Sequence, residues 1–279
     1  MSSVKQPMQK LSVVIVTFNE ERNIERCLLS VQWADEIIVV DAFSNDHTVE
    51  MCRRLNAKVV QRRWEGYAPQ KQFALSMASH AWVLLMDADE EASPELHREI
   101  DNVISAQSDI SGYEIARKSF FLGQWMKHGG WYPGYQLRLF LKSKAFIPQR
   151  PVHEGVEIEG TVGRLRNPLN HYTYYSLTQY LAKLNDYTSL DVMNRLHEKQ
   201  QGRVRWYNFI INPLSVFVRM FFVLTGFRDG FRGLLLAVYS SFYKLLLFAK
   251  VWEYQTAAER SQELPPVTSD ALNSIKRLP

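Results

Sequence analysis

Apolar runs alternate with amphipathic segments through the first hundred residues. Runs such as LSVVIVT (11–17) are continuous and rich in β-branched residues, which is typical of strands buried on both faces of a parallel sheet. Between these runs, apolar residues recur at helical spacing. The pattern predicts strands over 11–17, 36–40, 58–61 and 82–86, and helices over about 20–31, 67–79 and 94–103, with another helix beginning near residue 44. Asn19, Asp46 and Ser93 are the expected helix caps.

This alternation predicts a doubly wound α/β sheet, whose ligand would bind beyond the carboxyl ends of the strands. From Gly112 the pattern changes to short segments rich in aromatic residues and glycine, which indicates antiparallel strands and loops. Helical spacing returns after Tyr180, and amphipathic helices are expected over about 204–254. The chain is therefore expected to divide into 1–110, 111–200, 201–255 and a polar tail over 256–279.

Charge is concentrated in the third of these parts. The net charge of +4 is too small to indicate a nucleic-acid partner, but residues 203–253 hold seven basic side chains and two acidic ones. The same stretch is the most apolar one, and Arg232, Lys244 and Lys250 flank its apolar helical positions. A basic amphipathic helix of this kind can lie in the interface of an anionic membrane. The alternative is an ordinary helix packed on the rest of the protein.

A membrane-spanning helix and an export signal are not expected. The best apolar stretch, 206–218, is interrupted by Asn208, Asn212 and Pro213, so it falls short of the roughly 18 uncharged residues that a spanning helix needs. The first ten residues are polar, unlike those of a signal peptide. Cys27 and Cys52 fall in predicted helices, which suits a reducing compartment.

The sharpest chemical signal is the carboxylate sequence Asp87-Ala88-Asp89-Glu90, directly after a buried strand. Two carboxylates at a strand end can hold Mg²⁺ or Mn²⁺, which usually takes further ligands from substrate phosphates. The alternative is a solvated acidic turn. Asp41 ends the second strand and has two interpretations as well, as a ligand for a ribose or base and as a helix cap.

Several other chemistries lack their main sequence signature. No G-x-G-x-x-G follows the first strand, which argues against a dinucleotide-dependent dehydrogenase. The chain also lacks a P-loop, a G-x-S-x-G elbow, paired C-x-x-C motifs and H-E-x-x-H.

The motifs of this chain resemble a known family. The runs VVIVTFNEE, IIVVDAFSNDHT and WVLLMDADEEASPEL, within 11–99, resemble the N-terminal half of inverting family 2 glycosyltransferases with the GT-A fold. WYPGYQLRLF, PVHEGV and GFRDG (226–230) resemble the subgroup that includes the lipopolysaccharide inner-core β-1,4-glucosyltransferases. One departure is Ala42-Phe43 after Asp41, where the family more often has small polar residues.

The resemblance implies a role for each part of the chain. Residues 1–110 would be the nucleotide-sugar-binding half, 111–200 the acceptor-binding half and 201–255 the membrane-associating helices. Asp89 would bind the metal ion directly, and Asp87 would approach both the ribose and the metal. The other expected nucleotide-sugar ligands are Thr17, Asn19, Glu20, Asp41 and Lys71.

Inverting transfer also needs a general base, which takes the proton of the acceptor hydroxyl. Glu154 in the sequence VHEG is our choice, because Gly155 allows close approach of a ligand and His153 can orient the carboxylate. The alternative for Glu154 is a surface ion pair with Arg150, and Asp186 is the next carboxylate to consider as base. The expected acceptor ligands are Trp131, Tyr132, Gln136, Arg138 and His153.

Two of these assignments stay open at this point. Arg138 fits a salt bridge between the two halves as well as a ligand, and the aromatic rings of Trp131 and Tyr132 fit a protein core as well as a sugar face. His171 is open in the same way, between a ligand and a core histidine.

These features together predict a metal-dependent, inverting glycosyltransferase at the cytoplasmic face of the inner membrane. By resemblance, the donor would be UDP-glucose, the acceptor a lipid-linked saccharide such as the lipopolysaccharide core, and the cofactor Mg²⁺ or Mn²⁺. One alternative is a sugar-phosphate nucleotidyltransferase, although the first strand leads into TFNEER and not into a glycine-rich basic loop. The other is a non-catalytic adaptor on the membrane surface.

Overall fold

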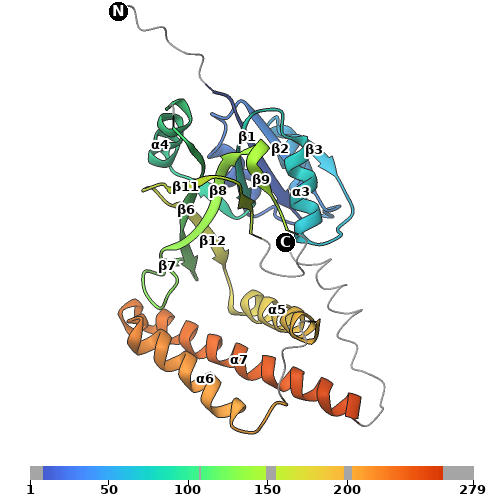
Figure 1. Cartoon of the computed structure of the whole chain (residues 1–279), viewed down its shortest axis with the longest axis vertical. Coiled ribbons are helices and arrows are strands. Elements are labelled where there is room, and N and C mark those ends of the chain that lie inside the picture. Colours follow the sequence, from blue (N-terminus) through green and yellow to red (C-terminus); the bar gives the residue numbers. More distant parts are fainter. Residues whose placement is uncertain (1–8, 107, 149–154, 198–202, 260–279) are drawn as a thin grey trace, which may run out of the picture.

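The computed structural model describes residues 9–106, 108–148, 155–197 and 203–259. A mixed sheet with helices around it occupies one end of the molecule, and three helices form a separate layer at the other end (Figure 1). The described part of the large sheet has the strand order β3-β2-β1-β4-β8-β6-β12-β5, with β7 and β11 also paired to β6. This α/β architecture confirms the predicted fold class.

The first half of the sheet is parallel, as predicted. Thr17 at the end of β1 pairs with Asp41 at the end of β2, and Val16 pairs with Asp87 at the end of β4. The polar strand ends therefore meet at one edge of the sheet, where α/β folds bind ligands. The elements of this half are β1 (Leu11–Thr17), α1 (Ile24–Leu29), β2 (Glu36–Asp41), α2 (Thr48–Arg54), β3 (Lys58–Gln61), α3 (Tyr67–Met77), β4 (Trp82–Asp87), β5 (Glu90–Ala92) and α4 (Pro94–Ser105).

One of the three predicted caps, Ser93, is confirmed. Its hydroxyl accepts a hydrogen bond from the Leu96 amide at 3.2 Å at the start of α4. The N-cap of α2 is His47 and not Asp46, although an oxygen of Asp46, one residue earlier, accepts from the Thr48 amide at 3.0 Å. Asn19 is not a cap. Its φ of 54° is left-handed, whereas N-cap residues are typically extended, and α1 begins only at Ile24. The Asn19 side chain accepts from the Asn45 amide instead.

The second half continues the same sheet. Strand β8 pairs antiparallel with β4 and with β6, as predicted, but β11 and β12 run parallel to β6, which the sequence pattern did not indicate. The edge strand β5 pairs antiparallel with β12. The elements of this half are β6 (Ile110–Phe121), β7 (Gln124–Trp125), β8 (Gly134–Leu141), the 3-10 helix η1 (Lys142–Lys144), β9 (Ala145–Phe146), β10 (Glu157–Ile158), β11 (Thr161–Arg164) and β12 (Leu169–Tyr174).

The helical layer consists of α5 (Leu177–His197), α6 (Asn208–Val218) and α7 (Gly230–Glu259), with the π-helical turn η2 (Arg219–Val223) and the 3-10 turn η3 (Gly226–Asp229) between α6 and α7. The α6 and α7 helices pack side by side as a hairpin, and α5 lies between α7 and the sheet (Figure 1). Helix α7 continues to Glu259, so residues 256–259 are helical and not part of a polar tail; Ala257 is buried.

The segment GFRDGFRG (226–233) joins this helical layer to the sheet. Both oxygens of the buried Asp229 carboxylate bind His128, one at the backbone amide and one at Nδ1, each at 2.8 Å. The amide of Gly129 donates to the Leu224 carbonyl at 2.8 Å. A Cβ on Gly233 would lie 1.9 Å from the Gly226 carbonyl oxygen, so only glycine fits there. We call residues 224–233 with their contacts to 122–131 the junction.

A buried ion cluster holds the two halves of the sheet together at the end of β4. Arg138 on β8 is 4% exposed, and its Nη2 contacts Asp87 at 2.5 Å and Glu90 at 2.6 Å. Burial alone would raise the pKa of Asp87, but Arg138, helped by Lys71, outweighs it and holds that pKa well below its usual value. Burial raises the pKa of Glu90, against the opposing effect of Arg138. Arg138 is therefore the salt bridge between halves, and its assignment as an acceptor ligand is corrected.

We expect Arg138→Met to destabilise the fold strongly, because it leaves two carboxylates buried without their cation. Removing one partner of a buried ion pair typically costs about 3–5 kcal/mol. Arg164→Met is the matched control: Arg164 also pairs with a glutamate of the sheet, Glu114, but is 64% exposed at its side chain, so its loss should destabilise the fold far less. Urea denaturation of both variants measures the difference. Equal losses would contradict the structural role of the cluster.

Candidate functional site

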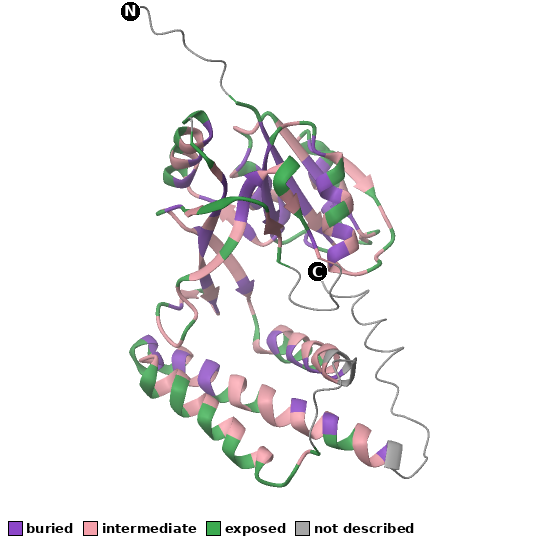
Figure 2. Cartoon of the chain, viewed as in Figure 1, coloured by how far each residue is buried: buried purple, intermediate pink, exposed green. Residues whose placement is uncertain are grey.

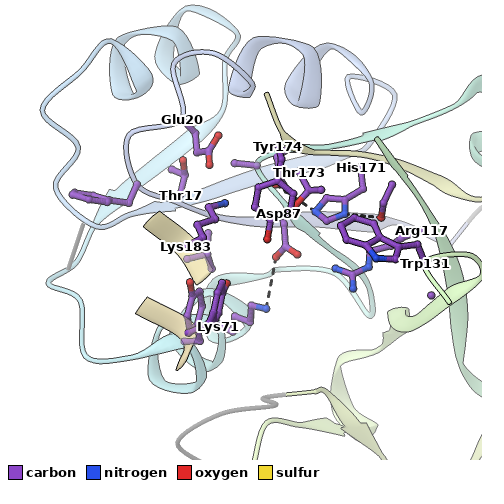
Figure 3. A pocket seen from close by; sticks show the side chains of 18 of the residues that line it. Thr17, Glu20, Lys71, Asp87, Arg117, Trp131, His171, Thr173, Tyr174 and Lys183 are labelled. Carbon is purple, nitrogen blue, oxygen red and sulfur yellow. Dashed lines mark hydrogen bonds and ion pairs between the residues drawn. The ribbon is translucent and has the colours of Figure 1, made fainter. Parts of the chain in front are cut away.

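A cavity of about 610 Å³ lies beyond the strand ends, between the sheet and the helical layer (Figure 3). It collects side chains from both halves of the sheet and from α3, α5 and α7. Its lining residues are Val16, Thr17, Phe18, Glu20, Trp64, Tyr67, Lys71, Asp87, Ala88, Asp89, Arg117, Ser119, Gly130, Trp131, Gly134, His171, Thr173, Tyr174, Lys183, Tyr187, Asp191 and Tyr243.

The structure brings together about half of the residues that the sequence nominated. Six of them line the cavity: Thr17, Glu20, Lys71, Asp87, Asp89 and Trp131. Five described ones do not: Asn19, Asp41, Tyr132, Gln136 and Arg138. Glu154 and His153 lie outside the described residues. Asp186, the next candidate base, does not line the cavity either, whereas Asp191 on the same helix does.

Asp41 does not line the cavity but fixes the loop next to it. It is fully buried, and its carboxylate accepts hydrogen bonds from the Ser44 amide at 2.9 Å, from the Ser44 hydroxyl, and from Gln61 at 3.1 Å. The loop that follows Asp41 in turn binds the backbone after β1: Ser44 accepts from the Asn19 amide, and Thr48 from the Glu20 amide, both at 2.8 Å. In this structure Asp41 and Asn19 therefore fix the loop that presents Glu20, and neither reaches the cavity.

Two more residues off the cavity, besides Arg138, have other surroundings. Gln136 is exposed on β8, where the side chains alternate between the two faces of the sheet. Tyr132 lies just before β8, half-buried, and packs edge-on against Trp125 with ring centroids 5.3 Å apart.

Asp89 and His171 form the pair that fits a metal ion best. The Asp89 carboxylate lies 3.4 Å from His171 Nε2, and Nδ1 of the same ring lies 3.1 Å from the Ser119 hydroxyl. Burial would lower the pKa of His171, but Asp89 outweighs it and raises that pKa. Carboxylate oxygen suits Mg²⁺ and Mn²⁺, and imidazole nitrogen is a common ligand of transition-metal ions. Within the described part of the chain, no group of three His, Cys, Asp or Glu side chains is close enough to bind a metal alone. Further ligands would have to come from water or substrate.

Positive charge and unsatisfied donors face these carboxylates across the cavity. Lys71 Nζ lies 3.6 Å from Asp87, and Arg117 and Lys183 point into the same space (Figure 3). Among the residues that the structure describes, the buried atoms Thr17 Oγ1, Trp64 Nε1 and Arg117 Nε find no hydrogen-bond partner. Buried polar atoms without partners are rare in proteins. These three are available to a polar or anionic ligand.

Glu20 is a cavity carboxyl whose pKa is raised by its surroundings. Burial, together with the nearby Asp89 carboxylate, raises the pKa of Glu20 to about 7. Its Oε2 accepts a hydrogen bond from the Asn23 amide group at 2.6 Å, which fixes its orientation. Glu20 can therefore donate a hydrogen bond to a ligand when it is protonated.

Sequence reasoning missed Trp64 and Arg117, and it missed every cavity residue of the helical layer. Lys183, Tyr187 and Asp191 come from α5 and Tyr243 from α7. The only available signal was spacing, because the three α5 residues recur every four positions and so share one helix face. Nothing in the sequence showed that this face meets the strand ends.

The helical layer also presents a broad apolar surface away from the sheet. No residue of α6 is buried, and side chains such as Ile210 and Leu214 are 57% and 58% exposed (Figure 2). We call the exposed side chains of this surface the apolar face. They are Trp206, Tyr207, Ile210, Ile211, Leu214, Val218, Phe222, Val223, Phe227, Phe231, Val238, Phe242 and Trp252.

Two expectations about the helical layer are corrected. Residues 226–257 form a helical segment that is long and apolar enough to cross a membrane by length and composition, because Lys244 and Lys250 are too few to offset its leucine and aromatic content. Only 22% of its most apolar window is buried. Arg232 and Lys250 do not face outward: Arg232 binds Leu122 and Gln124, and Lys250 donates to four oxygens of α5.

Comparison with known proteins places the chain among glycosyltransferases. The Glycosyl transferase family 2 domain matches residues 12–173. The lipopolysaccharide core biosynthesis glycosyltransferase LpsC of Rhizobium meliloti (strain 1021) is 29% identical over 274 residues, which cover 96% of this chain and 99% of that protein. An uncharacterized glycosyltransferase of Rickettsia typhi is 32% identical over 259 residues, 88% of each chain.

The solved structures that resemble the fold include S. aureus TarS 1-349 in complex with UDP-GlcNAc. It shares 16% identity at a TM-score of 0.46, over 91% of this chain and 92% of that one. The family domain spans more than half of the chain, from β1 to the last residues of β12. The protein described here is thus a member of glycosyl transferase family 2.

Proposed function

We propose that the protein is a metal-dependent, inverting glycosyltransferase that moves glucose from UDP-glucose onto a lipid-linked saccharide of the lipopolysaccharide core. The observation that carries this proposal is the cavity itself, where the strand-end carboxylates Asp87 and Asp89 face Lys71, Arg117 and Lys183. Such a mixture of carboxylates and cations suits a nucleoside diphosphate bound with a divalent ion. The similarity to LpsC, named for lipopolysaccharide core biosynthesis, supports the acceptor class.

In this proposal Asp89 and His171 hold Mg²⁺ or Mn²⁺, and the ion would neutralise charge on the diphosphate. Asp87 is kept ionised by Arg138 and Lys71 and is oriented for the donor. The unpartnered Thr17 and Trp64 donors are placed to bind the nucleotide or its sugar. Lys71, Arg117 and Lys183 stabilise the negative charge that develops on the leaving group.

The transfer step is a single displacement. The acceptor hydroxyl oxygen attacks the anomeric carbon from the face opposite the diphosphate, the new glycosidic bond forms as the bond to the diphosphate oxygen breaks, and UDP leaves. A general base takes the hydroxyl proton in the same step. We propose Glu154 as this base, on the strength of the VHEG sequence alone. Glu154 lies outside the residues that the structure describes.

The membrane is the proposed second partner. The apolar face consists of exposed side chains of the helical layer, and the exposed Arg205 and Arg219 flank α6, with Arg228 in η3. Apolar side chains flanked by arginines suit the interface of an anionic bilayer, with the α6–α7 hairpin lying in the plane of the membrane. This arrangement supports peripheral attachment to the cytoplasmic face of the inner membrane, where a lipid-linked acceptor would be available.

A screen of nucleotide sugars by thermal shift, with and without Mn²⁺, tests the donor and the metal together. A ligand at 100 times its Kd stabilises the fold by about 2.7 kcal/mol, so UDP-glucose with Mn²⁺ should raise the Tm clearly. Asp89→Asn should lose the Mn²⁺-dependent part of the shift and the transfer activity, while Asp101→Asn, an exposed carboxylate on α4, keeps both. Full activity of Asp89→Asn, or in excess chelator, would refute the metal dependence.

The product of the reaction separates the alternatives. A glycosyltransferase releases UDP from UDP-glucose, a nucleotidyltransferase releases pyrophosphate from UTP and a sugar phosphate, and an adaptor releases neither.

We expect Glu154→Gln to lower kcat by about 10²- to 10⁴-fold with little change in the Kd of UDP-glucose, because an amide keeps the shape of the side chain but takes no proton. Glu159→Gln provides the matched control, since Glu159 is an exposed glutamate of the same segment. Steady-state transfer rates and donor titrations measure the two quantities. If Glu154→Gln turns over like wild type, the base lies elsewhere.

Vesicle sedimentation tests the membrane partner. The protein should bind phosphatidylglycerol vesicles more tightly than phosphatidylcholine vesicles, and high salt should weaken the binding without abolishing it. Replacing Ile210 and Leu214 together by serine should lower partitioning by at least about tenfold, since each loses burial of an apolar side chain. The matched control is the double serine variant of Leu29 and Val162, which are exposed apolar residues of the sheet end of the molecule. Indifference of the wild type to both vesicles would remove this part of the proposal.

A further inference from the structure

The cavity has a wall that lies outside the family domain. That domain ends at residue 173, yet four cavity residues come from the helices that follow it: Lys183, Tyr187, Asp191 and Tyr243. The first three recur at i, i+4 and i+8 along α5 and therefore line the cavity as one stripe. Eight residues of α-helix span about 12 Å, so the two ends of the stripe lie far apart.

The beginning of this stripe belongs to the donor end of the cavity. Lys183 interacts electrostatically with the carboxylates of Glu20 and Asp89. Tyr187 interacts with Asp87 and Asp89 and hydrogen-bonds with Tyr67 at the start of α3. Asp191 follows about one helical turn, roughly 6 Å, beyond Tyr187 on the same face of α5. We therefore assign the Asp191 carboxylate to a different part of the substrate from the donor.

Asp191 and Tyr243 form a hydrogen-bonded pair at this far end. The Tyr243 hydroxyl donates to Asp191 Oδ2 at 2.5 Å and lies 3.4 Å from the Tyr187 carbonyl oxygen. Within the described residues the other oxygen of Asp191 accepts no hydrogen bond, so it is available to a ligand. A carboxylate oxygen beside a fixed phenol oxygen presents two adjacent acceptors, which match the hydroxyl donors on neighbouring carbons of a sugar ring.

Aromatic rings form another part of the cavity wall. Trp131 and Tyr174 line it, with their ring centroids 6.4 Å apart, and both pack against the same apolar cluster as Tyr243. That cluster includes the buried Phe121, so the wall is supported from behind. Aromatic surface next to a few fixed polar groups is the usual composition of a site for a small organic ligand, and a sugar offers an apolar ring face and polar edges to such a wall.

Building on the proposed function, we propose that α5 and α7 form the acceptor subsite, in which Asp191, fixed by Tyr243, binds adjacent hydroxyl groups of the acceptor saccharide while its ring packs on Trp131 and Tyr174. The wall that selects the acceptor is then supplied by helices outside the family domain. The same layer carries the apolar face, so a saccharide attached to a membrane lipid reaches the cavity from the helical side.

Binding of a soluble acceptor probe tests this subsite. Deacylated lipopolysaccharide core oligosaccharide is titrated calorimetrically into the full-length protein with UDP and Mn²⁺ present. Asp191→Asn should weaken the binding of this saccharide at least about tenfold, as expected when a charged hydrogen bond to a ligand hydroxyl is lost, and Tyr243→Phe should weaken it less. The Kd of UDP should stay within about twofold of wild type in both variants, because the donor end of the cavity is unchanged.

Matched controls lie on the same helices. Asp186→Asn is the control for Asp191→Asn, because Asp186 is on α5 but does not line the cavity. Tyr239→Phe is the control for Tyr243→Phe, because Tyr239 lies one turn earlier on α7 and packs against Tyr180. Both should bind the oligosaccharide like wild type. The proposal is overturned if wild type does not bind the oligosaccharide, if Asp191→Asn binds it as tightly as wild type, or if UDP affinity falls in parallel. Saccharide binding that depends on Asp191 without any glucosyl transfer would instead contradict the proposed function and leave the subsite intact.

Discussion

The guanidinium group of Arg138 allows two carboxylates to stand at the end of a buried strand. Asp87 ends β4, where the sheet changes from parallel to antiparallel pairing, and Glu90 begins β5. Without a cation between them, these two carboxylates would repel each other strongly in the low-dielectric interior. Arg138 comes from β8, the first antiparallel neighbour of β4. The donor end of the cavity therefore depends on the pairing of the two halves of the sheet, because one half supplies the carboxylates and the other supplies their cation. It also leaves Asp87 ionised and Asp89 free to pair with His171.

The second constraint is the attachment of the helical layer. The buried Asp229 carboxylate accepts two hydrogen bonds from His128, and the glycines of the junction allow backbone contacts that no larger residue would permit. Residues 122–131, which residues 224–233 contact in the junction, include Gly130 and Trp131, and both of these line the cavity. The position of the helices and the shape of the cavity wall therefore depend on the same few contacts. A residue as far from the strand ends as Asp229 has a direct structural reason to matter for the site.

The sequence was informative where local pattern and tertiary position coincide. Strands β1, β2 and β4 are continuous apolar runs that end in polar residues, so both their extent and the meeting of Thr17 and Asp87 at one edge could be predicted. Asp41 shows where this logic stops. Its strand end was predicted correctly, yet the carboxylate binds Ser44 and Gln61 because the following loop folds back over it, and no one-dimensional pattern encodes that fold-back.

The parallel pairing of β12 and the contribution of α5 to the cavity were not predictable for a related reason. Both depend on which elements far apart in sequence come to lie side by side. Lys183, Tyr187 and Asp191 look like an ordinary helix face in the sequence, and only the packing of α5 over the strand ends makes that face part of the cavity. The assignment of Arg138 depended on burial, which placed this cation between two carboxylates and away from the acceptor.

Two adjacent residues of helix α7 lie on different faces of the helix. Tyr243 reaches the cavity and Asp191, whereas Phe242, the residue before it, belongs to the exposed apolar face. Because one rigid helix carries both, the depth at which that face enters a bilayer would fix the height of the cavity above the lipid. Under the proposed membrane attachment, this fixed height would favour saccharides whose reacting hydroxyl group stands at a matching distance from the lipid, and so would select acceptors by the number of sugar units between the two.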